Sequence, residues 1–199
     1  MSEIEPGVLT VRGGTAVTIR AARRTDLGAV VDLLLDDPLG RVRESAIDLR
    51  PYEQAFDMLA VDPNQHAFVV TDGRGNGAET VVATFQLAFL TGLSRRGTRR
   101  AQIESVRVAA EWRDRGLGTE MVRWAVDLSR RNGCGMVQLT TDNSRHAAHR
   151  FYERLGFTSS HTGYRLVLGS SSSSETVPSS GTSSVDHGVS PERREESDQ

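Results

Sequence analysis

The chain has 199 residues, of which 37% are hydrophobic, and its formal net charge is −2. This length is enough for one sizeable hydrophobic core, and the near-neutral charge gives no reason to expect nucleic acid or an anionic membrane as a partner. Cys134 is the single cysteine and lysine is absent, which excludes a disulfide framework, a cysteine-built zinc site, a P-loop and lysine Schiff-base chemistry. No stretch approaches the length of a membrane span, so we expect a soluble, cytoplasmic protein.

Composition divides the chain into three parts. Residues 169–199 are rich in serine and carry six acidic residues against two arginines, which is typical of a disordered tail. Residues 1–15 are expected to be a flexible N-terminus. One domain without internal repeats remains, over residues 16–168.

The first predicted elements are a strand and two helices. Residues 16–21 alternate between apolar and polar side chains, as a half-buried strand does. Residues 24–37 have a helical apolar face, and Thr25 is placed to cap the N-terminus of that helix. Residues 50–63 have helical spacing of their apolar and aromatic side chains, and Pro51 suits the first turn.

Strands dominate the middle of the chain. Residues 66–72 and 79–90 flank a glycine-rich turn and predict a β-hairpin, which is followed by a further strand over residues 99–110. The later elements are, in chain order, a helix from Leu117 to near Gly133, a strand over 136–141, a helix over 144–155 and a strand over 164–168. The order β-α-α-β-β-β-α-β-α-β predicts a mixed α/β layer fold.

The strand that follows the hairpin departs from the period of two. Strict alternation places Ile103 on the face opposite Val106 and Val108, whereas one extra residue near Glu104 or Ser105 brings the three apolar side chains to one face. That pattern is typical of a β-bulge, which bends its strand and disrupts pairing to a neighbour. A strand buried on both faces explains the same residues, and both interpretations stay open.

The segment RDRGLG joins this strand to the next helix. Gly116 and Gly118 let the backbone approach a ligand closely, and a helix that begins near Leu117 leaves the N–H groups of its first turn unpaired. These features suit a phosphate or pyrophosphate, with Arg113 and Arg115 adding positive charge. Taken alone, an ordinary glycine-containing helix start explains the segment better.

Together with a second motif, RDRGLG resembles the GNAT superfamily of N-acetyltransferases. Val108 followed by RDRGLG matches an Arg/Gln-x-x-Gly-x-Gly/Ala loop, and one helix and one strand later comes FYERLGF, residues 151–157. The resemblance runs from Val17 to about Leu168 and is greatest to a subgroup of aminoalkylphosphonate and other small-amine N-acetyltransferases. It implies a central, mostly antiparallel twisted sheet flanked by helices, with one splayed strand pair.

The resemblance also implies where the co-substrate acetyl-CoA binds. It would lie between the splayed strands, and the backbone of Val106 and Val108 would pair with its pantetheine arm. The loop would hold the pyrophosphate through backbone N–H groups, with added charge from its arginines. The residues implied are Arg113, Arg115, Gly116, Leu117, Gly118 and Thr119. The resemblance implies no metal.

Two residues match the catalytic positions of the family. Tyr152 corresponds to the tyrosine that protonates the departing CoA thiolate, and Glu104 to the strand carboxylate that takes a proton from the substrate amine. His146 or His161 is an alternative base if Glu104 points away. Arg145 is a departure, because the family often has an asparagine at that position.

The implied function is N-acetylation of the primary amine of a small molecule, with no nucleic acid or membrane partner. The alternatives are a CoA-binding regulatory or interaction module without catalysis, and a protein N-acetyltransferase. A homodimer is compatible with the sequence. The acceptor pocket is expected around residues 39–56.

A cluster of arginines lies between the hairpin and the next strand. A solvated basic loop explains it, and so does a site for an acidic group of the substrate or for the 3′-phosphate of the coenzyme. The four residues are Arg95, Arg96, Arg99 and Arg100.

Overall fold

The computed structural model describes residues 4–36, 44, 46–73 and 79–168, and the tail predicted to be disordered, 169–199, lies outside them. The chain divides into two compact units, Met1–Thr162 and Gly163–Gln199. All regular elements within the described residues belong to the first unit. In chain order they are β1 (Gly7–Thr10), β2 (Ala16–Ala21), η1 (Arg24–Asp26), α1 (Leu27–Leu35), α2 (Arg50–Val61), β3 (Gln65–Asp72), β4 (Thr80–Leu90), α3 (Ser94–Gly97), β5 (Arg100–Val108), η2 (Ala110–Trp112), α4 (Leu117–Arg131), β6 (Met136–Leu139) and α5 (His146–Arg154).

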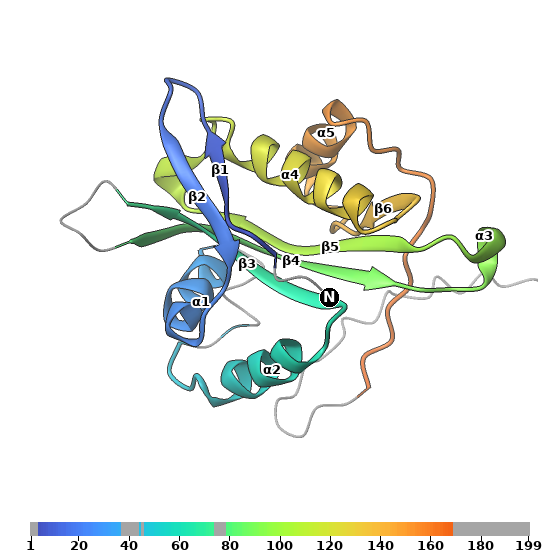
Figure 1. Ribbon diagram of the computed structural model, residues 1–199, viewed down its shortest axis with the longest axis horizontal. Coiled ribbons are helices and arrows are strands. Elements are labelled where there is room, and N and C mark those ends of the chain that lie inside the picture. The colour runs from blue at the N-terminus through green and yellow to red at the C-terminus, as the bar shows by residue number, and fades with distance from the viewer. Residues whose placement is uncertain (1–3, 37–43, 45, 74–78, 169–199) are drawn as a thin grey trace, which may run out of the picture. The chain divides into compact units, whose positions relative to one another are not determined.

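One six-stranded sheet forms the centre of the first unit. Its strands follow the order of the sequence, β1-β2-β3-β4-β5-β6. Neighbouring strands are antiparallel except β5 and β6, which run parallel because α4 crosses between them. α1 and α2 cover one face of the sheet, and α4 and α5 cover the other (Figure 1). The mixed, mostly antiparallel sheet flanked by helices is therefore confirmed.

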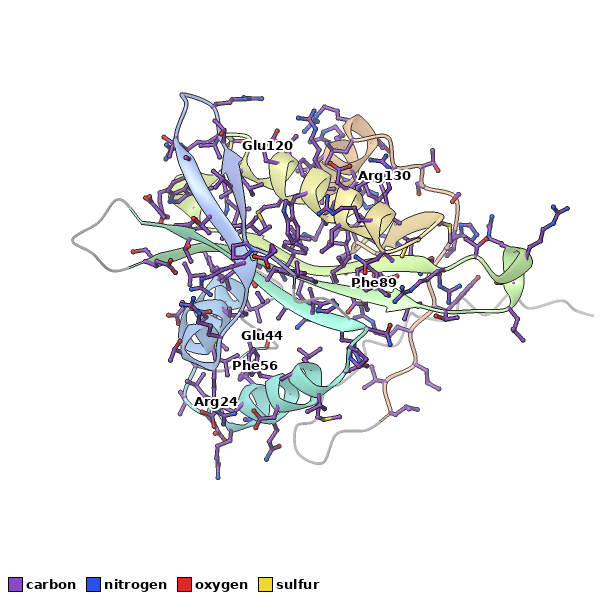
Figure 2. All side chains as sticks on the ribbon, viewed as in Figure 1. Arg24, Glu44, Phe56, Phe89, Glu120 and Arg130 are labelled. Atoms are coloured by element: carbon purple, nitrogen blue, oxygen red, sulfur yellow. The ribbon has the colours of Figure 1, made fainter. Side chains whose placement is uncertain are left out.

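The hydrophobic core lies between the sheet and α4. Phe68 of β3 stacks on Phe85 of β4 with ring centroids 5.1 Å apart, and Trp124 of α4 meets Phe68 edge-on at 5.0 Å. Phe89 lies in the same layer, whereas Arg130 projects from the outer side of α4 into solvent (Figure 2). The amphipathic pattern read from the sequence thus orients α4 on the sheet.

Three local features differ from the sequence prediction. Residues 7–10 form β1 and pair with β2, although a flexible N-terminus was expected there. Thr25 does not cap α1, because η1 precedes that helix and the side chain of Asp26 accepts a hydrogen bond from the backbone N–H of Arg23. Residues 164–168 form no strand. Alternation predicts a strand's faces but does not say whether a neighbouring strand is available to pair with it.

A buried ion pair fastens β2 to the start of α1. Two guanidinium nitrogens of Arg20 donate to the carboxylate of Asp26 at 2.7 and 3.1 Å, and both residues are only 7% exposed. Arg20 also donates to Glu79 at 2.9 Å. Burial alone would raise the pKa of Asp26, but the hydrogen bonds from Arg20 and from the backbone N–H of Arg23 outweigh it and lower that pKa.

We predict that Asp26→Asn lowers the free energy of unfolding by about 3 kcal/mol at pH 7, because it leaves the buried guanidinium undercompensated. The folded-state pKa of Asp26 is lowered, so the wild-type advantage is present above the unfolded pKa of about 3.9 and is lost as the pH falls further. Urea unfolding of both proteins from pH 7 to pH 3 measures this. Asp57→Asn, which breaks an exposed pair with Arg24, is the control and should change stability far less. Equal losses of unfolding free energy in Asp26→Asn and Asp57→Asn would contradict the prediction.

Candidate active site

A β-bulge interrupts β5 where the sequence predicts one. Gln86 of β4 pairs with Glu104, but Thr84, two residues away on β4, pairs with Arg107, three residues along β5. β5 therefore contains one extra residue over this stretch, and Ser105 within it has a left-handed φ of 53°. Of the two interpretations of this strand, the bulge is confirmed.

The pairing of β5 with β6 stops just before the bulge. It runs from Arg100 opposite Met136 to Ile103 opposite Leu139, and it continues no further within the described residues. Past Ile103, the edge of β5 on the β6 side has backbone groups without a strand partner. Such an edge can accept another extended chain.

The open edge belongs to Val106 and Val108. The N–H of Ala109 donates to a carbonyl of β4 at 2.9 Å, and backbone groups of successive residues point to opposite edges, so those of Val106 and Val108 point away from β4. The carbonyl of Val106 accepts from Nη1 of Arg107 at 2.9 Å, and that of Val108 from Nε of Arg113 at 3.0 Å. The amide groups of an extended ligand lying along this edge could replace these two side-chain donors.

α4 begins a few residues after the open edge. Gly116 occupies the N-cap position with a left-handed φ of 85°, and no side chain caps the helix. The N–H groups of the first turn, at Leu117, Gly118 and Thr119, therefore lack intrahelical partners. The side chain of Leu117 is buried in the core, and a Cβ on Gly118 would meet the ring of Phe151 at 3.4 Å, an ordinary contact.

The arginines of this loop are held by the protein. Arg113 donates to the carbonyl of Val108 and to the carboxylate of Asp36 at 2.5 Å. The guanidinium of Arg115 lies over the ring of Trp112, 4.5 Å from its centroid. The loop therefore offers an anion mainly its backbone and the positive end of α4.

Tyr152 lies on α5, against the apolar core. Its ring meets those of Phe151 and Phe157 edge-on, with centroids 5.0 and 5.8 Å away. Burial raises the pKa of the phenol, and the charges of Arg145 and Arg107 offset only part of that rise. The phenol is therefore protonated at neutral pH and can act as a proton donor.

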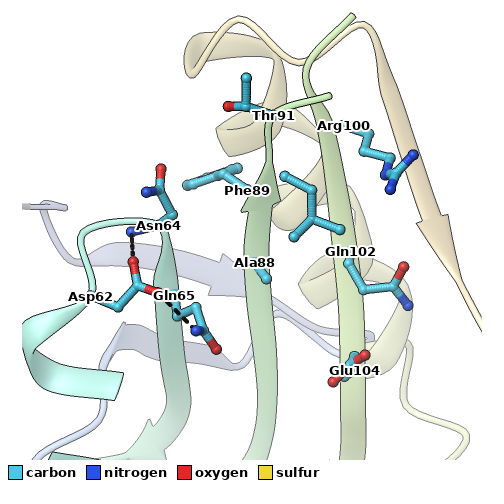
Figure 3. A pocket seen from close by; sticks show the side chains of 10 residues that line it. Asp62, Asn64, Gln65, Ala88, Phe89, Thr91, Arg100, Gln102 and Glu104 are labelled. Carbon is cyan, nitrogen blue, oxygen red and sulfur yellow. Dashed lines mark hydrogen bonds between the residues drawn. The ribbon is translucent and has the colours of Figure 1, made fainter. Parts of the chain in front are cut away.

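A polar cavity of about 540 Å³ opens on the sheet (Figure 3). Ala101 and Ile103 of β5 are buried in the core, so the residues that alternate with them face the cavity. Its volume is typical of a site for a small molecule. Its lining comes from β3, β4, β5 and the segment after α2: Asp62, Asn64, Gln65, Ala88, Phe89, Leu90, Thr91, Arg100, Gln102 and Glu104.

Glu104 connects the cavity with the open edge. It lines the cavity and a smaller recess that extends to Leu59 of α2, and it directly precedes Ser105 of the bulge. Tyr152 lines neither space, and neither does any residue of the region 39–56 in which the acceptor pocket was expected. Part of that region lies outside the described residues.

The histidines considered as alternative bases lie elsewhere. His146 and His161 are exposed and line neither the cavity nor the recess. His161 shares a hydrogen bond with the hydroxyl of Ser160 at 2.8 Å, and His149 with the carbonyl of Asp142 at 3.0 Å. Of these three candidates, only Glu104 lines the cavity and the recess.

Sequence reasoning missed most of the cavity lining. Asn64, Gln65 and Gln102 drew no functional interpretation. One signal was available in β5, where Arg100, Gln102 and Glu104 alternate with apolar residues. The cavity residues of β3 and of the segment before it lie more than 30 residues earlier in the chain. They reach the same cavity because β4 lies between β3 and β5, which no local pattern identifies.

The described residues offer neither a metal cluster nor a membrane-spanning helix. They contain no group of three or more His, Cys, Asp or Glu side chains that could hold a metal ion. None of the helices traced among them is both long and apolar enough to cross a membrane.

Known proteins match this chain in sequence and fold. The family model described as acetyltransferase (GNAT) family matches residues 28–157. The structure of a transcriptional regulator from Bacillus halodurans C-125 is 38% identical, covers 76% of this chain and 99% of its own, and superposes with a TM-score of 0.72. That of a putative acetyltransferase from Agrobacterium tumefaciens is 27% identical, with coverages of 75% and 99% and a TM-score of 0.65. The aminoalkylphosphonate N-acetyltransferase of Salmonella typhimurium is 24% identical over 75% of this chain and 90% of its own length.

We predict that the phenol of Tyr152 titrates above the ordinary tyrosine pKa of about 10, because burial disfavours the phenolate. The difference in phenolate absorbance between wild type and Tyr152→Phe isolates this group. Arg107→Gln should raise the pKa further, because the Arg107 charge stabilises the phenolate, whereas Arg123→Gln, on the exposed side of α4, should not. A titration at or below pH 10 would refute the assignment.

Proposed function

The chain belongs to the acetyltransferase (GNAT) family, whose members generally use acetyl-CoA, and on that premise we propose that it acetylates the primary amine of a small molecule. Membership makes the chain an acyl-CoA-dependent N-acetyltransferase. The proposal of a small-molecule amine as acceptor rests mainly on the position of Glu104, which lies between the small-molecule cavity and the open edge of β5.

The residues present fit acetyl-CoA as co-substrate. The open backbone groups of Val106 and Val108 suit the amides of its pantetheine arm, and the uncapped start of α4 at Gly116 suits its pyrophosphate. Leu117, Gly118 and Thr119 contribute backbone N–H groups there. Arg113 and Arg115 act chiefly by shaping the loop, since both already have protein partners. Bound acetyl-CoA supplies the activated acetyl group as a thioester.

Glu104 is the general base of the proposed reaction. An amine is protonated at neutral pH and must lose a proton before its lone pair can attack a carbonyl carbon. The Glu104 carboxylate lies at the cavity wall, and no protein partner occupies it within the described residues, so it is free to accept that proton.

Tyr152 is the general acid. As the new C–N bond forms, the C–S bond breaks and the sulfur leaves with its electron pair, which a proton from the phenol neutralises. A phenol that burial keeps protonated suits this task. The only thiol in the chain, Cys134, has a pKa raised by burial, which supports direct attack by the amine over an acetyl-cysteine intermediate.

Two other functions remain as alternatives. The Bacillus halodurans structure is that of a transcriptional regulator, and a comparable role for this chain would make it a CoA-binding regulatory module. A protein N-acetyltransferase is the other. Thiol release from acetyl-CoA, measured over a panel of amines and peptides, separates the three: release with small amines supports the proposal, release with peptides alone supports the second alternative, and CoA binding without release supports the first.

We predict that Gly116→Val weakens acetyl-CoA binding at least tenfold, because a β-branched residue resists the left-handed φ and displaces the backbone at the start of α4. Gly133→Val is the matched control, since Gly133 has a φ of 73° just beyond the other end of α4. Calorimetric titration measures both. Both variants should lose similar stability, but only the first should lose affinity. Equal acetyl-CoA affinities of the two variants would mean that the loop is an ordinary helix start without a role in binding.

We predict that Glu104→Gln and Tyr152→Phe each lower kcat by about 100-fold or more, with little change in the Kd of acetyl-CoA. Tyr152→Phe should abolish an alkaline limb that lies above pH 10 in the wild type, because the phenol pKa is raised. Full activity of Tyr152→Phe over the whole pH range would refute its role as the acid.

A further inference from the structure

Two charged side chains without protein partners face the same cavity. Arg100 and Glu104 are four residues apart on β5, and both line the cavity (Figure 3). Within the described residues, the side chain of neither takes part in a hydrogen bond or an ion pair. Arg100 is half-buried, and its Nε is fully buried without a hydrogen-bond partner in that part of the chain. Buried polar atoms normally have partners, so this one calls for a ligand.

The neighbouring Arg99 also has a buried Nε without a partner among the described residues, but its terminal nitrogens are engaged. Arg99 donates to the side-chain oxygen of Asn64 at 2.8 Å and to the carbonyl of Asn132 at 3.0 Å, and its guanidinium lies 5.0 Å from the centroid of Phe89. Arg99 is therefore a structural residue that ties the cavity rim to the end of α4. Of these two adjacent arginines, only Arg100 is available to a ligand.

The other acidic residue of the cavity has its partners. Asp62 accepts from the backbone N–H of Asn64 and from the side-chain amide of Gln65, both at 2.8 Å. The carboxamide oxygen of Gln102 accepts from Gln138 at 2.7 Å, which leaves the Gln102 NH₂ group to donate into the cavity between Arg100 and Glu104. The side-chain groups without protein partners are therefore a cation at Arg100, a hydrogen-bond donor at Gln102 and an anion at Glu104, in that order along β5.

Resting on the proposed function, we infer that the acceptor is an amine that also carries an anionic group, with its ammonium end at Glu104 and its carboxylate, phosphonate or phosphate at Arg100. The Cα atoms of the two residues lie about 13 Å apart along the strand, so the acceptor is elongated. The guanidinium of Arg100 matches the planar or tetrahedral oxygens of such a group.

The 3′-phosphate of the coenzyme is not the partner of Arg100. Arg100 begins β5 and Val108 ends it, about 26 Å away, and the loop at Gly116 lies beyond Val108. A phosphate bound near that loop is out of reach of Arg100. Arg100 instead lines the cavity that also holds Glu104.

The test compares amines that differ only in their second group. Each ω-amino carboxylate is paired with its neutral amide, and each ω-aminoalkylphosphonate with the amino alcohol of equal length, over increasing chain lengths. We expect the anionic member of a pair to have a kcat/KM at least tenfold above that of its neutral partner. Comparison of the two anionic series tells carboxylate from phosphonate.

Arg100→Gln should abolish the preference for the anionic member, so that kcat/KM for the two members of each pair becomes equal within about twofold. Arg96→Gln, which removes the same charge from the exposed turn of α3, is the matched control and should preserve the preference. Equal use of both members by the wild type, or an unchanged preference in Arg100→Gln, overturns the inference while the proposed function stands.

Absence of turnover with every amine would instead overturn the proposed function. Calorimetric binding of the same pairs to wild type and Arg100→Gln then decides the inference without turnover. Tighter binding of the anionic members by wild type alone would support the anionic subsite, and equal binding by both proteins would refute it.

Discussion

The extra residue in β5 is the constraint on which the proposed active site depends. A continuous ladder would pair β5 with β6 along its whole length and leave no backbone group for a ligand. Ser105 breaks that ladder, so the carbonyls of Val106 and Val108 remain on an open edge while Glu104 keeps its place on the cavity face. A left-handed serine costs about 1 kcal/mol, which the paired remainder of the sheet readily outweighs.

The bulge also divides β5 into two halves with different structural roles. Before it, the strand pairs on both sides, one face is buried in the core, and the other face lines the cavity. After it, the strand pairs only with β4 and leads to the uncapped start of α4. The proposed acceptor and co-substrate thus meet near Glu104 and Ser105, where the two halves join.

Arginine supplies every basic side chain of this protein, and the fold assigns these residues different roles. Arg20 is buried in an ion pair, Arg113 joins the loop to Asp36, and Arg99 stacks on an aromatic ring. Arg100 alone among these lacks a partner within the described residues. The arginine cluster predicted as one basic loop is therefore divided by strand alternation, which sends Arg99 and Arg100 to opposite faces.

The sequence by itself determined α1, α2, α4 and α5, most strands and the two motifs that indicated the family. It predicted the position of the bulge as one of two alternatives. All of these depend on neighbouring residues, whose period of 2 or 3.6 is readable locally. The pairing of residues 7–10, the absence of a strand at 164–168 and the cavity came only from the tertiary structure. The register of β3, β4 and β5 places Asp62 and Glu104 at the same cavity. Register is set by packing between segments that are far apart in the chain, so no local pattern records it.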